Sequence, residues 1–194
     1  MKKIVNDVNN VEEEMIQGLV KSAPKKLRKL DYGTIVVRAD KKEDKVALVS
    51  GGGSGHEPAH AGYVGTGMLD CAVAGTVFTS PTPDQVLEGI KAVATDKGVL
   101  CVVKNYTGDV MNFEMAIEMA ADEDIKADYV VVNDDVAVRD SLYTTGRRGV
   151  AGTIFVHKIA GAKAKQGAEL PEVKAVAEKV IANVIANPNI RFAL

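Results

Sequence analysis

The stretch Val46-Ala-Leu-Val-Ser-Gly-Gly-Gly-Ser-Gly-His56-Glu-Pro58 joins a short apolar run to a cluster of glycines and then to a histidine. Val46 to Val49 have the length and composition of a buried strand. The glycines that follow can adopt backbone conformations closed to other residues, and Pro58 suits the first turn of a helix. This order predicts a strand, a glycine loop and a helix start, whose backbone N–H groups suit an oxygen-rich or anionic ligand.

The glycine cluster does not match the common nucleotide-binding motifs. A Walker loop ends in Gly-Lys-Ser/Thr, whereas this one ends in Gly55-His56-Glu57. The dinucleotide pattern G-x-G-x-x-G, begun at Gly51, places His56 where the last glycine belongs. We therefore predict a ligand site to which the loop delivers a histidine. A tight turn with an incidental histidine is the alternative.

Composition narrows the class of protein. In 194 residues, 46% are apolar and 26% charged, which is typical of one globular domain and argues against disorder. The net charge of −2 favours no nucleic-acid partner, and no apolar run approaches the ~20 residues that span a membrane. The start of the chain lacks the apolar core of a signal peptide, so a cytoplasmic location is expected. Cys71 and Cys101 lie in apolar runs and are predicted to be buried, reduced thiols.

Periodicity predicts alternating strands and helices. Helices are expected over residues 9–22, 84–95, 110–122, 153–165 and 171–186, and a short helix or turn over 58–68. Strands are expected over 34–38, 46–49, 71–78, 99–104 and 129–132, and the basic cluster Lys25–Lys29 is expected to be a solvated loop. Strands that are apolar on both faces and alternate with helices predict an α/β layered domain with a largely parallel central sheet flanked by helices.

Four of these strands end in polar segments. They are Ser50–His56, Thr79–Asp84, Lys104–Asp109 and Asn133–Asp135. Because ligands of such sheets bind outside the carboxyl ends of the strands, we expect these segments to converge on one crevice.

His56, Lys104 and Asp109 would place an imidazole, a cation and a carboxylate in that crevice. This set suits a small polyhydroxy or carbonyl ligand, since Lys104 donates to oxygens and Asp109 accepts from a hydroxyl. Either Asp109 or His56 could act as general base towards a hydroxyl that is transferred onto an electrophile. The alternatives are that Asp109 only caps a helix beginning at Val110, and that Lys104 is a solvated charge.

The remaining candidates have simpler explanations. His60 and His157 are expected to make buried structural contacts, and no third ligand completes a metal site with His56 and His60. Arg147 and Arg148 are expected in a solvated or salt-bridged loop. Asp134 and Asp135 resemble a magnesium pair only loosely and are explained as well by a strand-end turn. No metal is predicted.

Five motifs in order along the chain resemble dihydroxyacetone kinase. They are Ser50-Gly-Gly-Gly-Ser-Gly-His-Glu-Pro58, Phe78-Thr-Ser-Pro-Thr-Pro-Asp84, Lys104-Asn-Tyr-Thr-Gly-Asp109, Asp134-Asp-Val-Ala-Val138 and Ser141-Leu-Tyr-Thr-Thr-Gly-Arg-Arg-Gly149. The resemblance is to the substrate-binding K subunit, or to the equivalent part of the single-chain ATP-dependent enzymes. It implies that dihydroxyacetone is bound by Gly53, Ser54, Gly55, His56, Lys104 and Asp109, with His56 or Asp109 as the catalytic base.

The resemblance also implies partners. A separate helical L subunit would carry ATP or ADP with magnesium, so this chain would bind no cofactor itself, and a phosphoprotein of the phosphotransferase system would supply phosphate indirectly. A homodimer is implied too.

Residues 1–186 correspond to the first of two domains of the family, and the tail 187–194 does not resemble the usual continuation. In the family, the second domain supplies a histidine that binds the ketone covalently. The expectation is therefore either a truncated product or a natural half-subunit, and a non-catalytic or regulatory dihydroxyacetone-binding module is the alternative function.

Overall fold

The computed structural model describes residues 4–40, 43–137 and 146–186, and its described strands form one six-stranded sheet in the order β1-β2-β4-β3-β5-β6. In chain order the strands are β1 (Leu27–Lys29), β2 (Ile35–Arg38), β3 (Ala47–Ser54), β4 (Cys71–Val77), β5 (Val99–Lys104) and β6 (Ala127–Val132). β4, β3, β5 and β6 run parallel, whereas β2 pairs antiparallel with β1 and β4. The predicted α/β fold with a largely parallel sheet is confirmed.

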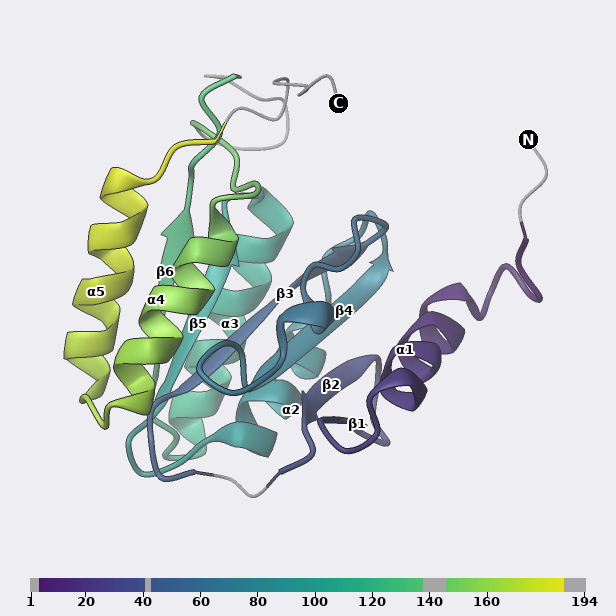
Figure 1. Ribbon diagram of the computed structural model, residues 1–194, viewed down its shortest axis with the longest axis horizontal. Helices are drawn as coiled ribbons and strands as arrows, with labels where there is room; N and C mark the ends of the chain where they lie inside the picture. The colour runs from purple at the N-terminus through teal and green to yellow at the C-terminus, as the bar shows by residue number, and fades with distance from the viewer. Residues whose placement is uncertain (1–3, 41–42, 138–145, 187–194) are drawn as a thin grey trace.

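Helices cover both faces of this sheet (Figure 1). They are α1 (Val11–Ser22), α2 (Pro83–Val93), α3 (Thr107–Asp122), α4 (Thr153–Lys165), α5 (Leu170–Asn183) and the short 3-10 turn η1 (Ala61–Tyr63). α1, α4 and α5 pack into the core on one face, and α2 and α3 into the core on the other. The five predicted α-helices are all present, with ends within a few residues of those expected.

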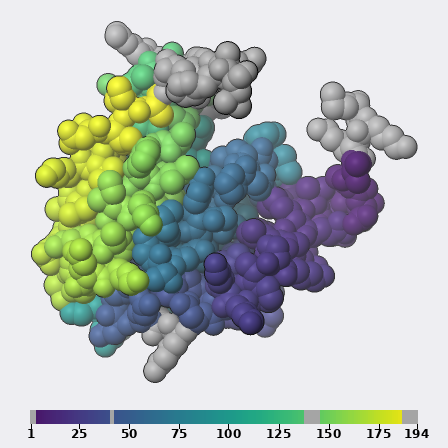
Figure 2. All heavy atoms as spheres, viewed as in Figure 1, coloured from purple at the N-terminus to yellow at the C-terminus, as the bar shows by residue number. Residues whose placement is uncertain are grey.

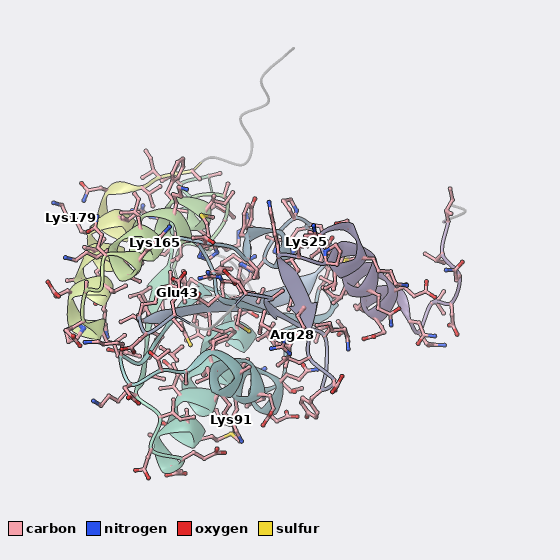
Figure 3. All side chains as sticks on the ribbon, turned by 60° about the horizontal axis from the view of Figure 1, so that its bottom comes forward. Lys25, Arg28, Glu43, Lys91, Lys165 and Lys179 are labelled. Atoms are coloured by element: carbon pink, nitrogen blue, oxygen red, sulfur yellow. The ribbon has the colours of Figure 1, made fainter. Side chains whose placement is uncertain are left out.

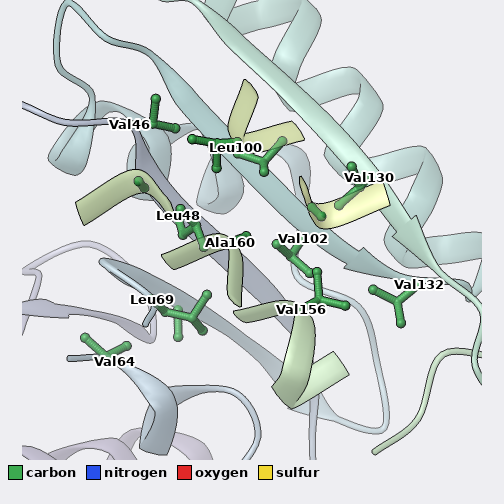
Figure 4. Packing of buried hydrophobic residues seen from close by; sticks show 14 of the residues in the cluster. Val46, Leu48, Val64, Leu69, Leu100, Val102, Val130, Val132, Val156 and Ala160 are labelled. Atoms are coloured by element: carbon green, nitrogen blue, oxygen red, sulfur yellow. The ribbon is translucent and has the colours of Figure 1, made fainter. Parts of the chain in front are cut away.

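The strand residues alternate between the two cores. On β2, Val36 belongs to the core that α1, α4 and α5 cover, while its neighbours Ile35 and Val37 belong to the core that α2 and α3 cover. This two-sided burial explains why the strands are continuous apolar runs. Figure 4 shows the first core, in which Leu48, Leu100 and Val102 of the sheet contact Val156 and Ala160 of α4.

The glycines after Val49 are not a loop, which corrects the prediction from the opening stretch. β3 continues through Gly51, Gly52 and Gly53 to Ser54 and pairs with β4 along this length. A strand without side chains lets neighbouring backbone approach closely. A Cβ on Gly53 would lie 2.6 Å from the backbone nitrogen of Thr79.

No α-helix begins at Pro58, which corrects the expected helix start, whereas the turn expected as the alternative over residues 58–68 is present. The chain forms turns there and only the 3-10 turn η1, in which the Tyr63 N–H donates to the His60 carbonyl. Glycines at 62, 65 and 67 explain the short length, since glycine disfavours helix propagation. The expected helix-terminal cradle of N–H groups is therefore absent from this described segment.

Two other boundaries differ from expectation. The basic cluster Lys25–Lys29 was expected to be a loop, but Leu27–Lys29 forms β1 because it pairs with β2 through Arg28↔Val37. α3 begins at Thr107 rather than Val110, since the Val110 N–H already donates to the Tyr106 carbonyl. Residues 138–145 and the tail 187–194 lie outside the described residues, so predictions made for them stay predictions.

The surface carries charges on many elements. Among the side chains labelled in Figure 3, Lys91 belongs to α2, Lys165 to α4 and Lys179 to α5. In the space-filling view, α1 and the α4–α5 pair lie at opposite sides of one face, with the segment around residues 55–70 between them (Figure 2). Cys71 and Cys101 are buried and unpaired as predicted. Across the described helices, none has the length and apolarity to cross a membrane.

Candidate functional site

A cavity of about 1120 Å³ lies at the carboxyl ends of the parallel strands β3, β4 and β5, and residues at the start of α4 form its remaining wall. The residues that line it lie within the segments 53–63, 78–80, 104–109 and 148–157. Three of the four polar segments that follow the strands therefore converge, as predicted. The fourth segment, Asn133–Asp135, does not line the cavity, but Asp134 and Asp135 bind residues of its wall.

Lys104 ends β5 and is only 7% exposed, so it is not the solvated charge considered as an alternative. Its Nζ lies 2.5 Å from Nε2 of His56, which follows the end of β3. Burial lowers the pKa of Lys104, and the carboxylates of Asp109 and Asp134 oppose that shift. Burial and the nearby Lys104 charge lower the pKa of His56. A neutral His56 therefore accepts a hydrogen bond at Nε2 from the Lys104 ammonium group.

Asp109 lies in the first turn of α3 and is 4% exposed. Because the helix begins at Thr107, Asp109 is not its N-cap, and the capping explanation is wrong. Burial raises the pKa of Asp109, while a hydrogen bond with Ser80 and the charge of Lys104 lower it. Its Oδ1 is buried without a hydrogen-bond partner among the described residues. A buried carboxylate of raised proton affinity is suited to accept a proton.

The glycine segment contributes less than predicted. Gly53 lines the cavity, but Ser54 and Gly55 are absent from its described lining. The Ser54 hydroxyl is buried and donates to the Gly75 carbonyl at 2.7 Å. Gly55 lies beside the Phe78 ring. Roles for Gly53, Ser54 and Gly55 in substrate binding stay predictions, and this geometry favours Gly53.

Two further histidines line the cavity. The ring centroids of His60 and His56 are 5.9 Å apart, and those of His60 and His157 are 5.7 Å apart. The predicted buried contact of His60 is confirmed, since its Nδ1 lies 3.2 Å from the Ser50 hydroxyl. Burial lowers the pKa of His60 well below its ordinary value and that of His157 to about 3, so both are neutral near pH 7.

The wall formed by residues 148–154 is held by the two aspartates after β6. Asp134 accepts hydrogen bonds from the N–H groups of Val150 and Gly152 at 2.8 and 2.7 Å. Asp135 binds the Arg148 guanidinium, at 2.8 Å for the closest pair of atoms. The two aspartates are thus hydrogen-bonded supports, and Arg148 is salt-bridged as expected.

Aromatic side chains also line the cavity. Phe78 is 80% exposed and has a φ of +54°, which is rare for a bulky residue. The Tyr106 ring lies 5.7 Å from the Lys104 ammonium nitrogen, within cation–π range.

Within the described ranges, no group of three or more histidine, cysteine, aspartate or glutamate side chains is arranged to hold a metal ion.

Sequence reasoning found His56, Lys104 and Asp109 but missed other cavity residues. Ser80 and Tyr106 stood in strand-end segments that were already singled out, so their position was the available signal. Nothing in the local pattern placed His157 here, because α4 carries it to the cavity from about 100 residues beyond His56 along the chain.

The chain is similar to known proteins over most of its length. The Dak1 domain family matches residues 17–187. The PTS-dependent dihydroxyacetone kinase 1, dihydroxyacetone-binding subunit DhaK of Listeria innocua is 62% identical over 184 residues, covering 95% of this chain and 56% of that protein. The corresponding PEP-dependent subunit of Escherichia coli is 52% identical over 171 residues, or 88% of this chain and 48% of that protein.

Solved structures show the same similarity. The dihydroxyacetone kinase of C. freundii in complex with AMP-PNP and Mg²⁺ superposes with a TM-score of 0.88 at 42% identity, over 94% of this chain and 34% of that one. A Lactococcus lactis protein described under regulation of the dha operon superposes with a TM-score of 0.83 at 41% identity, over 91% of this chain and 55% of that one. The chain spans about half the length of the curated subunits it matches.

Proposed function

The chain belongs to the Dak1 domain family, and from that premise we propose that it is the dihydroxyacetone-binding part of a dihydroxyacetone kinase. In this function the cavity positions the ketone so that one of its hydroxyl groups receives a phosphoryl group from a nucleotide on a partner subunit. The similarity to dihydroxyacetone-binding subunits over most of the chain supports the choice of substrate.

The observation that carries the proposal is the joint placement of His56, Lys104 and Asp109 in one cavity at the strand ends. An ammonium group and an imidazole can hydrogen-bond to carbonyl and hydroxyl oxygens, and a buried carboxylate can accept a proton. The cavity volume of about 1120 Å³ leaves room for a three-carbon substrate together with a group delivered from outside.

The chemical step transfers one phosphoryl group. The ionised carboxylate of Asp109 takes the proton of the substrate hydroxyl, whose oxygen forms the new bond to phosphorus. The bond between phosphorus and the bridging oxygen of the nucleotide breaks, and that oxygen keeps the electron pair. His56 is the alternative proton acceptor, but its Nε2 faces the Lys104 ammonium group. We therefore assign the base to Asp109 and substrate orientation to His56 and Lys104.

The partners follow from the same proposal. A nucleotide-carrying L subunit would bring ATP or ADP with magnesium to the mouth of the cavity, and a phosphotransferase-system phosphoprotein would restore its phosphate. The names of the bacterial relatives, which include PTS-dependent and PEP-dependent kinases, support this source of phosphate. A homodimer and a cytoplasmic location complete the proposal.

The test is reconstitution of the kinase reaction. The full chain is combined with L subunit, nucleotide, magnesium and dihydroxyacetone, and phosphorylated product is measured. Product should form with the parent chain and be lost with His56→Ala and with Asp109→Ala. Asp122→Ala is the matched control, because Asp122 is an exposed carboxylate at the far end of the same helix as Asp109.

Calorimetric titration with dihydroxyacetone separates the outcomes. A parent chain that binds the ketone without turnover would contradict the kinase function and leave a non-catalytic binding module. A parent chain that neither binds nor turns over the ketone would contradict the proposal entirely. Full activity in both variants would contradict the assignment of His56 and Asp109.

A further inference from the structure

A chain of hydrogen bonds leads from the sheet to His60. The Ser50 hydroxyl oxygen lies 2.6 Å from the carbonyl oxygen of Val102 on β5 and 3.2 Å from Nδ1 of His60. Ser50 is fully buried and His60 is 6% exposed. Both side chains are therefore held in an interior where water does not compete for these bonds.

The protons in this chain can be assigned. A carbonyl oxygen only accepts, so the single hydroxyl proton of Ser50 must lie between the two oxygens, which are 2.6 Å apart. The Ser50 oxygen is then left as an acceptor towards His60, and Nδ1 must be the protonated nitrogen. Because His60 is neutral, its Nε2 carries a lone pair and no proton.

Nε2 of His60 and a carboxylate oxygen of Asp109 both border Gly52. A Cβ built on Gly52 would lie 3.4 Å from Nε2 of His60 and 3.5 Å from Oδ2 of Asp109. The two atoms therefore flank the same glycine of β3. Nε2 of His60 and Oδ1 of Asp109 are both buried and lack hydrogen-bond partners among the described residues. The charged and titratable groups around His60 are Lys104, His56, His157 and Asp109.

We infer that His60 is a positioning residue, which Ser50 holds as the Nδ1–H tautomer so that an unprotonated Nε2 faces Asp109 across Gly52. Ser80 and Lys104 stabilise the ionised form of Asp109, but on the side of Gly52 the carboxylate then faces an acceptor instead of a further donor. The repulsion between these two acceptors disappears when Asp109 takes up a proton, so His60 raises the proton affinity of Asp109. The inference rests on the proposed function, in which Asp109 is the base, and deepens it.

The tautomer can be read directly. The chain has only three histidines, so ¹⁵N NMR of the histidine-labelled full chain gives three resolvable rings. We expect His60 to show a protonated Nδ1 and an unprotonated Nε2 near pH 7. In Ser50→Ala the Nδ1 proton loses its acceptor, and the ring should shift towards the Nε2–H tautomer.

A matched control exists on the same strand. Ser54 is also buried on β3, but its hydroxyl donates to Gly75. Ser54→Ala should therefore leave the His60 tautomer unchanged. An Nε2–H tautomer in the parent chain, or the same response to both serine variants, would overturn the inference whether or not the chain is a kinase.

The effect on Asp109 is read from the pH dependence of kcat/KM in the reconstituted reaction. His60→Gln presents an amide N–H donor near the position of Nε2, and Ser50→Ala lets the imidazole present one. A donor stabilises the ionised form of Asp109, so the acidic limb of the profile should move to lower pH by roughly half to one pH unit in both variants. A weaker base should also lower kcat more than it changes KM.

The two proposals fail differently. An inert parent chain contradicts the proposed function and leaves the NMR result to decide the tautomer. An active parent whose acidic limb stays in place in both His60→Gln and Ser50→Ala contradicts the role of His60 while the proposed function stands.

Discussion

The ammonium nitrogen of Lys104 lies 2.5 Å from Nε2 of His56, although the two residues are 48 positions apart in the sequence. Lys104 is the last residue of β5 and His56 follows β3, and these two strands are hydrogen-bonded neighbours. The contact makes the Lys104 charge part of the environment that keeps His56 neutral. The sheet thus determines the protonation state of a loop histidine.

Replacing Lys104 should change the titration of His56. In Lys104→Met the cation is lost and the pKa of His56 should rise, by roughly half to one unit, because the imidazolium no longer faces a like charge. NMR titration of the three histidines measures this directly. Lys174→Met, which removes a lysine bound to Asp128 at the surface, is the control. An unchanged His56 pKa in Lys104→Met would contradict the contact.

Replacing Asp109 should stabilise the fold and lower the activity. Its folded-state pKa is raised, mainly by burial, so folding favours its protonated form and ionisation destabilises the fold as the pH rises above the unfolded-state pKa. Asp109→Asn should therefore raise the free energy of unfolding at pH 7 by about 1 kcal/mol, while the reconstituted activity falls about 100-fold or more. Urea unfolding and kinase assays test both parts. A destabilised Asp109→Asn would contradict the argument.

Asp134 should be needed for the cavity wall. Asp134→Ala removes the acceptor of the Val150 and Gly152 N–H groups, and we expect it to lower the free energy of unfolding by about 3 kcal/mol, because both bonds are charge-assisted. Asp128→Ala is the matched control. Asp128 is paired with Lys174 near the surface, so its loss should cost about 1 kcal/mol or less. Equal losses in urea unfolding would show that Asp134 does not brace the wall.

Gly149 should tolerate no side chain. Its Cβ would lie 2.5 Å from the Val132 carbonyl oxygen and 2.9 Å from the Cα of Lys104, so Gly149→Ala forces backbone apart and should destabilise the fold by about 1–3 kcal/mol. Gly18→Ala is the control, because no atom lies within 4 Å of its Cβ position on α1. That change should stabilise the fold by about 0.5–1 kcal/mol. Thermal unfolding of both variants distinguishes the two outcomes.

His157 should weaken the fold in acid. The pKa of His157 is 6.5 in the unfolded chain and about 3 in the folded protein. As the pH falls from 6.5 towards 3, only the unfolded chain binds a proton at His157, so the folded state loses stability. Between pH 7 and pH 4.5 the parent chain should therefore lose about 2 kcal/mol more than His157→Phe does, since phenylalanine takes up no proton. Urea unfolding at the two pH values measures the difference. Equal losses would mean that His157 is not held neutral.

Much of this protein was determined by local sequence. The apolar runs predicted all four parallel strands and all five α-helices, because burial on both faces of a sheet and on one side of a helix leaves a repeating pattern. The same pattern placed Lys104 at a strand end with Asp109 in the segment that follows it, and the order of strands and helices predicted that several such ends would meet.

Only the tertiary structure decided what the glycines and the buried polar groups do. Gly51 to Gly53 look like a loop because glycine favours turns, but they belong to β3 because pairing with β4 stabilises an extended backbone there. His60 and His157 look structural in the sequence, yet the fold brings both to the cavity. The residue type determines which hydrogen bonds a side chain can make. Only the packing of distant segments determines which partners lie within its reach.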